Sequence, residues 1–150
     1  MTTAEDARPN SSIAEDALVD AIVEASFATM AVLTKVGAEH ELSLTQLRVL
    51  GILRDRRLRM STLADYLGLE KSSLTGLVDR AAKRGLLERA PSESDGRAVD
   101  VFLSSDGVDI AEALYAQVRQ ALAPLTTRLT ASERPRLEVL LRRLLGPTSL

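Results

Sequence analysis

The sequence has no cysteine, one histidine (His40) and only four aromatic residues among 150. Without cysteine, the chain cannot form disulfides, thiolate metal sites, a cysteine nucleophile or a thiol redox switch. A single histidine also excludes a histidine-rich zinc or iron site. Because there is in addition no Gly-rich phosphate loop and no recognisable pair of spaced carboxylates, we expect neither an enzyme nor a metal or cofactor site.

Leucine and alanine are abundant instead, with 26 and 20 residues. Both favour helices, so the composition predicts a mainly α fold, and the length fits one domain. Residues 1–12 are acidic and rich in Pro, Asn and Ser, which predicts a flexible tail. The most apolar stretch, residues 17–36, is interrupted by Asp20, Glu24 and Lys35. We therefore expect no membrane span and a cytoplasmic protein.

The first half of the chain has the spacing of four helices. Apolar residues recur every three or four positions over residues 13–36, and Gly37 is expected to end this first helix. Ser43 and Gln46 have the spacing of a capping box, which predicts a second helix through Leu47, Leu50 and Leu53. Ser61 is expected to cap a third helix over residues 62–67, and a fourth helix is expected over residues 71–83.

The second half begins with a change of period. Residues 87–90 and 98–103 flank a turn-rich segment and predict a β-hairpin. A helical seam then runs from Ala111 to Leu129, with a kink expected at Pro124. A last helix carries leucines at positions 137, 140, 141, 144 and 145. Its start is open, because Thr130 and Glu133 form a possible capping box, whereas Pro135 fits better if Ser132 is the cap.

The third and fourth helices have the pattern of a helix-turn-helix. Ala64 is small where two helix axes approach, Gly68 stands where the chain reverses, and Leu74 is apolar where the second helix fills the space between them. Any short helical hairpin could show this pattern. The fourth helix adds to it, because its outward side has short polar residues toward the N-terminus and cations toward the C-terminus, as DNA recognition requires.

The tip of the hairpin reads Asp95-Gly96-Arg97. A hairpin beside a recognition helix can place an arginine in the adjacent minor groove. Asp95 is expected to hold the Arg97 guanidinium by a charge-assisted bond. Asp79, on the fourth helix, could accept a hydrogen bond from cytosine or orient Arg80.

Several linked motifs make the chain resemble the MarR family. They are the runs at residues 68–80 and 83–89, the Asp95-Gly96-Arg97 tip, and Leu103-Ser-Ser-Asp-Gly107. The resemblance covers almost the whole chain. It implies a mainly α fold with a small β-hairpin wing, in which a winged helix-turn-helix (residues 41–104) is inserted between dimerisation helices (residues 13–40 and 105–146). Within it, the helix-turn-helix is expected at residues 61–84 and the wing at residues 87–103.

The same resemblance implies a homodimeric repressor that binds a pseudo-palindromic operator in double-stranded DNA and is released by a small lipophilic or phenolic effector. Activation is an alternative, since the position of the operator relative to the promoter decides whether a bound regulator represses or activates transcription. The residues implied at the DNA are Lys71, Ser72, Ser73, Thr75, Gly76, Arg80, Lys83, Arg84, Asp95 and Arg97. Two positions depart from the family pattern, Glu70 at the helix cap and Ala82, which leaves the base contacts open.

The net charge of −2 argues against nucleic acid until the chain is divided. Residues 1–47 sum to −6, residues 48–100 to +3 and residues 101–150 to +1. The predicted DNA-binding segment is therefore cationic, and the local field governs phosphate contact.

Two further groups have open assignments. An effector pocket could be lined by Phe27, Met30, His40, Leu44, Leu47 and Arg48, which could equally be core or interface residues. The basic loop at residues 54–59 could contact the DNA backbone or simply be solvated. The alternative function is a winged-helix module that binds another protein; acidic or bulky residues on the recognition face would indicate it.

Overall fold

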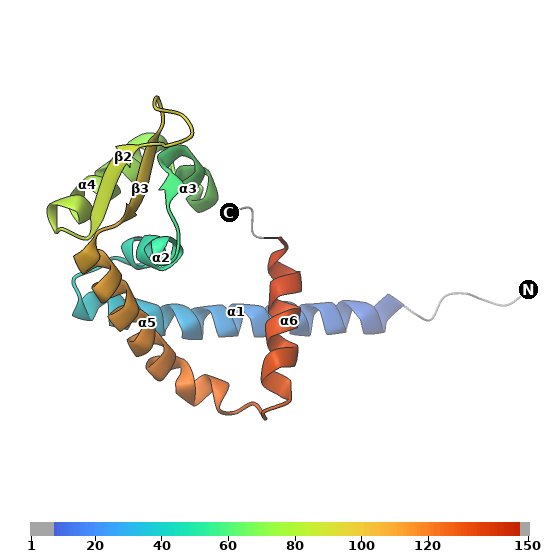
Figure 1. Cartoon of the computed structure of the whole chain (residues 1–150). Coiled ribbons are helices and arrows are strands. Elements are labelled where there is room, and N and C mark those ends of the chain that lie inside the picture. Colours follow the sequence, from blue (N-terminus) through green and yellow to red (C-terminus); the bar gives the residue numbers. More distant parts are fainter. Residues whose placement is uncertain (1–7, 148–150) are drawn as a thin grey trace, which may run out of the picture.

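The computed structural model describes residues 8–147 and is mainly helical with a small antiparallel sheet, as predicted (Figure 1). In chain order, its elements are α1 (Arg8–Glu39), α2 (Leu44–Leu53), β1 (Leu58–Arg59), α3 (Met60–Leu67), α4 (Lys71–Lys83), β2 (Leu87–Pro91), β3 (Val99–Leu103), α5 (Ser105–Thr126) and α6 (Glu133–Leu145). The sheet, α3 and α4 form one lobe above α2, and α1 and α5 lie beneath it. Most of the predicted tail lies outside the described residues, but residues 8–12 belong to α1, which begins earlier than expected.

Gly37 does not end α1, which continues to Glu39. Its role is close packing, because a Cβ at this position would lie 2.8 Å from the carbonyl oxygen of Leu42. The Leu42 amide also donates to the Gly37 carbonyl at 2.9 Å. The chain reverses at Glu41, which has a positive φ of 55°. Gly37 therefore allows the α1–α2 turn to fold back against the helix that it leaves.

The capping box of α2 is confirmed: the Gln46 amide donates to Ser43 Oγ at 3.2 Å, and the Ser43 amide donates to Gln46 Oε1 at 2.9 Å. The expected cap of α3 is wrong, since α3 begins at Met60 and Arg59 occupies the cap position without a side-chain bond. The reason is that residues 58–59 pair with β3, so the chain enters α3 directly from a strand.

The sheet has three strands in the order β1-β3-β2, where the sequence predicted a two-stranded hairpin. Leu58 pairs with Val101, which in turn pairs with Arg89 of β2. Val101 is fully buried and packs into the core formed largely by leucines of α2, α3 and α4. The strand β1 is only two residues long and lies beside an arginine-rich segment, so its period could not be detected in the sequence.

Helix α5 is capped by Ser104, whose Oγ accepts from the Gly107 amide at 2.9 Å. It ends at Thr126, so Leu129 lies beyond it and Pro124 is in its last turn. The start of α6 combines both alternatives. The helix begins at Glu133, so that Pro135 falls in its first turn, and the Thr130 amide donates to the Glu133 carboxylate at 2.8 Å.

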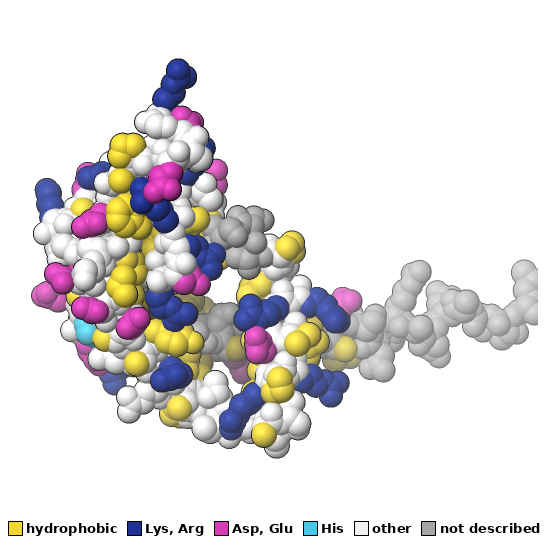
Figure 2. Space-filling view, viewed as in Figure 1, with side chains coloured by type: hydrophobic (Ala, Val, Ile, Leu, Met, Phe, Trp, Pro, Cys, Tyr) yellow, Lys and Arg dark blue, Asp and Glu magenta, His cyan; other side chains and the backbone are white. Residues whose placement is uncertain are grey.

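Much of the apolar surface of α1 and α6 is uncovered in the single chain (Figure 2). No side chain of α6 is buried. Contrary to the expectation above, the Ser12–Glu39 part of α1 is long and apolar enough to cross a membrane. Core helices of soluble proteins and signal sequences have the same length and composition, so this property alone is weak evidence for a membrane span. A large exposed apolar surface of this kind indicates that another protein surface or a membrane buries it.

Candidate nucleic-acid interface and ligand pocket

The helix-turn-helix forms as predicted. Gly68 ends α3 in the left-handed conformation with a φ of 65°, and the Leu69 amide bonds the Ala64 carbonyl at 3.0 Å. Ala64 and Leu74 are both buried between the two helices. These three positions set the angle at which α4 leaves the turn.

The outward side of α4 carries the predicted polar and basic residues. Those exposed to solvent are Lys71, Ser72, Ser73, Thr75, Arg80 and Lys83. The Thr75 hydroxyl donates to the Lys71 carbonyl at 2.8 Å, which leaves its oxygen able to accept a further bond. Gly76 is half-buried, and a Cβ there would lie 3.4 Å from Nη1 of Arg80. The small residues therefore leave this face open for a partner to approach.

The Asp79 carboxylate contacts the wing and not Arg80. It forms an ion pair with Arg89 of β2 at 2.7 Å. The pair joins α4 to β2 and compensates the charge of the carboxylate on this face.

Arg84 was expected at the DNA but is held elsewhere. Its guanidinium donates to the carbonyl oxygens of His40 and Glu41, both at 2.8 Å. The contact fastens the end of α4 to the α1–α2 turn. Arg84 therefore has a structural role at that junction, and its contact with DNA stays a prediction.

The wing tip has the predicted residues but a different bond. Asp95 Oδ1 accepts from the backbone amide of Arg97 at 3.1 Å rather than from its guanidinium. The Ala98 amide bonds the Asp95 carbonyl at 2.9 Å, and the Ser92 amide bonds the Ala98 carbonyl at 2.8 Å. Asp95 thus shapes the turn, while the Arg97 side chain is exposed. In Figure 2 a basic side chain extends from the tip of the wing.

A groove of about 360 Å³ lies between the wing and the start of α4. Its basic and polar lining includes Lys71, Thr75, Arg89 and Arg97. The structure therefore brings the wing arginine and the N-terminal half of α4 to one surface. Anions of a nucleic-acid backbone fit such a surface by charge.

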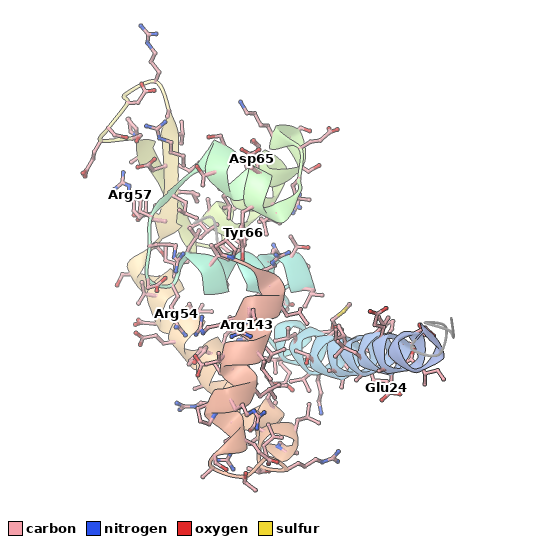
Figure 3. The ribbon with its side chains drawn as sticks, turned by 90° about the vertical axis from the view of Figure 1, so that its right-hand side faces the viewer. Glu24, Arg54, Arg57, Asp65, Tyr66 and Arg143 are labelled. Carbon is pink, nitrogen blue, oxygen red and sulfur yellow. The ribbon has the colours of Figure 1, made fainter. Side chains whose placement is uncertain are left out.

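The arginines of the basic loop have different neighbours, and Figure 3 shows Arg54 and Arg57 well apart. The Arg54 guanidinium lies 4.0 Å from the centre of the Tyr115 ring on α5. Arg56 pairs with the adjacent Asp55 at 3.0 Å. Arg57 and Arg59 instead contact the wing. The loop is neither uniformly solvated nor a single basic patch.

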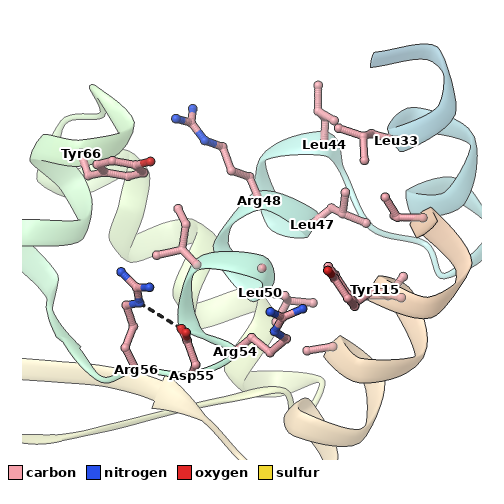
Figure 4. Close-up of a pocket in the computed structure, with 15 residues that line it drawn as sticks. Leu33, Leu44, Leu47, Arg48, Leu50, Arg54, Asp55, Arg56, Tyr66 and Tyr115 are labelled. Atoms are coloured by element: carbon pink, nitrogen blue, oxygen red, sulfur yellow. Dashed lines mark hydrogen bonds and ion pairs between the residues drawn. The ribbon is translucent and has the colours of Figure 1, made fainter. Parts of the chain in front are cut away.

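An apolar pocket of about 530 Å³ opens between α2, α3, α5 and one residue of α1 (Figure 4). Of the residues expected there, Leu44, Leu47 and Arg48 line it. Phe27 and Met30 are exposed on α1 away from it.

His40 is also outside the pocket, because its Nε2 bonds Gln117 Oε1 at 2.7 Å near the α1–α2 turn. Sequence reasoning missed Arg54, Tyr66 and Tyr115 in the pocket wall. The scarcity of aromatics was the available signal, since both tyrosines of the chain line this cavity.

The polar groups of the pocket are mostly cationic. Arg48 lies 5.4 Å from the centre of the Tyr66 ring, and Arg54 stacks on Tyr115. The hydrogen bond and positive charge of Arg56 lower the pKa of the Asp55 carboxyl below its ordinary value, so Asp55 is ionised and compensates Arg56. Among the described residues, Arg48 and Arg54 have no carboxylate partner, so they provide the uncompensated positive charge of the pocket. Within residues 8–147, no cluster of three or more metal-binding side chains is found.

A helix-turn-helix followed by an antiparallel wing and set among long helices defines a winged helix-turn-helix protein. A sequence profile of the MarR family matches residues 40–98. The chain is 38% identical over 84 residues to the multiple antibiotic resistance protein MarR of Salmonella typhimurium, covering 55% of this chain and 58% of that protein. It is 37% identical over 76 residues to the HTH-type regulator YfiV of Bacillus subtilis, covering 50% of this chain and 48% of that protein.

Similarity to a solved structure extends further along the chain. A mutant MarR from E. coli complexed with operator DNA superposes with a TM-score of 0.67 at 26% identity, covering 94% of this chain and 100% of that one. The chain spans about half the length of the curated relatives that it matches in sequence. With the fold and the linked motifs, these matches show that the chain is similar to MarR-family proteins, most clearly over residues 40–98.

Proposed function

We propose that this chain is a transcriptional regulator that binds a pseudo-palindromic operator as a homodimer and represses transcription. The observation that carries the proposal is the surface shared by α4 and the wing, where short polar and basic side chains lie beside the exposed Arg97. The major groove admits an α-helix, and such side chains can reach its base edges. The similar E. coli MarR is complexed with operator DNA, which supports the same use of this surface.

The homodimer is inferred from the uncovered apolar helices. α1 exposes Ile13, Phe27 and Met30, and α6 exposes Leu140 and Leu144. A second copy would bury such faces, and a two-fold dimer would match two operator half-sites about one helical turn, 10 to 10.5 base pairs, apart. Repression is preferred to activation because one relative, 29% identical over 86 residues, is the transcriptional repressor MprA of E. coli.

The apolar pocket would admit the effector. Its walls are leucines and two tyrosine rings, and Arg48 and Arg54 are the cations in it that have no carboxylate partner among residues 8–147. An aromatic ring with a carboxylate or phenolate fits both features, because the ring packs on apolar walls and the anion meets a guanidinium. The pocket lies between the dimerisation helices and the winged helix, so its occupation can alter how the two are placed.

The DNA-binding proposal is tested by selection from a pool of random duplexes with the purified full-length chain. We expect enrichment of an inverted repeat, and an affinity that falls steeply with salt because several phosphates release counterions. No enriched duplex, or binding that is independent of salt, contradicts the proposal and favours the protein-interaction alternative.

The dimer is tested separately by sedimentation equilibrium. We expect a particle of twice the 16.2 kDa chain mass. A monomer that partitions into lipid vesicles would instead show that a bilayer covers α1.

A further inference from the structure

Arg57 connects the basic loop to both strands of the wing. Its Nε donates to Asp100 Oδ2 at 3.0 Å, and its Nη2 approaches the Pro91 carbonyl at 3.5 Å. The guanidinium also lies 4.4 Å from the centre of the Phe102 ring. Pro91 belongs to β2, whereas Asp100 and Phe102 belong to β3. One side chain therefore touches both strands close to the point where the wing loop begins.

The partner of Arg57 makes this contact specific. The Asp100 side chain is only 12% exposed, while that of Arg57 is 36% exposed. A carboxylate this buried needs a partner, since leaving a buried charge uncompensated is strongly destabilising. The Arg57 contact therefore restricts where the base of the wing can lie.

A second tether reaches the wing loop itself. Arg59 Nη2 donates to Ser94 Oγ at 2.8 Å, and Ser94 Oγ lies 3.1 Å from Oγ of the buried Ser92. Residues 57 and 59 thus hold the wing at its base and in its loop. The same segment begins in the pocket wall, with Arg54, Asp55 and Arg56.

We propose that Arg57 is the positioning residue of the wing: by holding Asp100, it keeps Arg97 at the distance from α4 that DNA binding requires. The inference rests on the proposed DNA-binding function and assigns Arg57 to the wing rather than to a phosphate. It explains why the loop is rich in arginine although its guanidinium groups have partners within the chain.

The two roles predict opposite results for Asp100→Asn. This change leaves Arg57 itself unaltered but removes the carboxylate charge of Asp100 that pairs with the Arg57 guanidinium. If Arg57 contacts phosphate, the added net positive charge tightens DNA binding. If Arg57 positions the wing, the affinity for the selected duplex falls by about tenfold, an effect of the size that one lost specific contact produces. Glu93→Gln is the matched control, because it adds the same charge on the exposed wing loop and should bind equally or more tightly.

A double-mutant cycle tests whether Arg57 acts through Arg97. We expect Arg57→Ala to weaken binding about as much as Arg97→Ala, and the double variant to bind no more weakly than Arg97→Ala alone. Arg57→Lys should restore part of the affinity. The lysine ammonium can still pair with Asp100, but it cannot stack on the Phe102 ring as the planar guanidinium does. Fully additive losses would overturn the inference.

Hydrogen exchange tests the positioning without DNA. The Ser92 and Ala98 amides are bonded within the wing. In Asp100→Asn they should exchange about tenfold faster, while the amides of Leu63 and Val78 in the core keep their protection. Unchanged exchange at Ser92 and Ala98 would overturn the inference. If no duplex is selected by the unmodified chain, the proposed function fails, but this measurement still decides whether Arg57 and Asp100 hold the wing.

Discussion

Arginine side chains that look equivalent in the sequence have distinct partners. Arg97 is exposed at the wing tip, Arg89 pairs with Asp79, and Arg84 bonds two carbonyl oxygens of the α1–α2 turn. Of these three, Arg97 is the one whose side chain makes no hydrogen bond or ion pair within the part of the chain that the structure describes. Charge alone therefore does not separate arginines that face solvent from those that hold the fold together.

Arg97→Ala should weaken binding to the selected duplex by about tenfold, since a contact in the minor groove and its counterion release are lost. Titration by fluorescence anisotropy at several salt concentrations measures the effect, and the slope of log K against log salt should fall by about one. Dimerisation, followed by sedimentation, should not change. An unchanged affinity would show that the wing does not touch DNA.

Substitutions of two neighbouring residues at the end of α4 should affect different properties, one the stability of the fold and the other the DNA affinity. Arg84→Ala removes two bonds from a charged group and should lower the free energy of unfolding by about 1 to 2 kcal/mol, with little effect on the DNA affinity of the folded chain. Lys83→Ala, one residue before it, should weaken DNA binding and leave the free energy of unfolding nearly unchanged, because Lys83 is exposed. Urea denaturation and DNA titration of both variants check this. The assignment of Arg84 fails if its loss weakens DNA binding and leaves stability unchanged.

At the level of elements, close approaches between segments place the winged helix on the long helices. Gly107, in the first turn of α5, packs directly against the Leu86 backbone, whose carbonyl accepts from the Ser104 amide at 3.0 Å. A Cβ at Gly107 would overlap that carbonyl oxygen. This contact gives a physical reason for the glycine that closes the Leu103-Ser-Ser-Asp-Gly107 motif.

Gly107→Ala should therefore destabilise the chain by roughly 1 to 3 kcal/mol, because the α5 terminus must move away from the sheet. Gly51→Ala is the matched control: it is also a helical glycine, but a Cβ there meets nothing within 4 Å. That change should stabilise by about 0.5 to 1 kcal/mol through helix propensity. Urea denaturation of both variants measures the difference, and equal effects would contradict the packing argument.

The pocket is built where α2, α3 and α5 meet, so its chemistry also belongs to this scale. 4-Hydroxyphenylacetate is a suitable probe, because it has an aromatic ring and a carboxylate. We expect Arg54→Ala to weaken its binding by about tenfold, since the carboxylate loses a charged partner. Isothermal titration calorimetry measures this, with Lys35→Ala, a cation outside this pocket, as the control. Equal affinity in Arg54→Ala would remove Arg54 from the site.

For the whole molecule, the charge and the apolar surface are segregated. The acidic first third and the uncovered helices α1 and α6 form one part, and the cationic winged helix forms the other. The net charge of −2 therefore reveals little about partners. A second copy on the apolar helices would leave both recognition surfaces free for one duplex.

The double substitution Leu140→Asp and Leu144→Asp should convert the dimer to monomer, because two carboxylates would be buried in an apolar interface. Sedimentation equilibrium measures the mass, and the melting temperature should lose its dependence on protein concentration. Arg136→Ala, an exposed polar position on the same helix, should leave the dimer intact. A dimer that survives the double substitution would place the interface elsewhere.

Much of the fold follows from short-range chemistry and could be predicted. The capping box at Ser43, the left-handed Gly68 and the polar face of α4 depend on residues within one or two helical turns of each other. The prediction that Ser61 caps α3 was wrong because a distant segment intervenes: β1, which leads into α3, pairs with β3. The Gly37 prediction was wrong for a local reason, since Gly37 packs against the Leu42 backbone while α1 continues to Glu39.

The sequence by itself determined the helices, the winged helix-turn-helix and the resemblance to the MarR family, since these depend on local spacing and on motifs in order. Only the tertiary structure decided the partner of each arginine, the residues of the pocket and the third strand. Arg57 and Asp100 are 43 positions apart, and His40 and Gln117 are 77 apart. Such pairs leave no periodic trace in the sequence, because their geometry exists only after the core has brought the segments together.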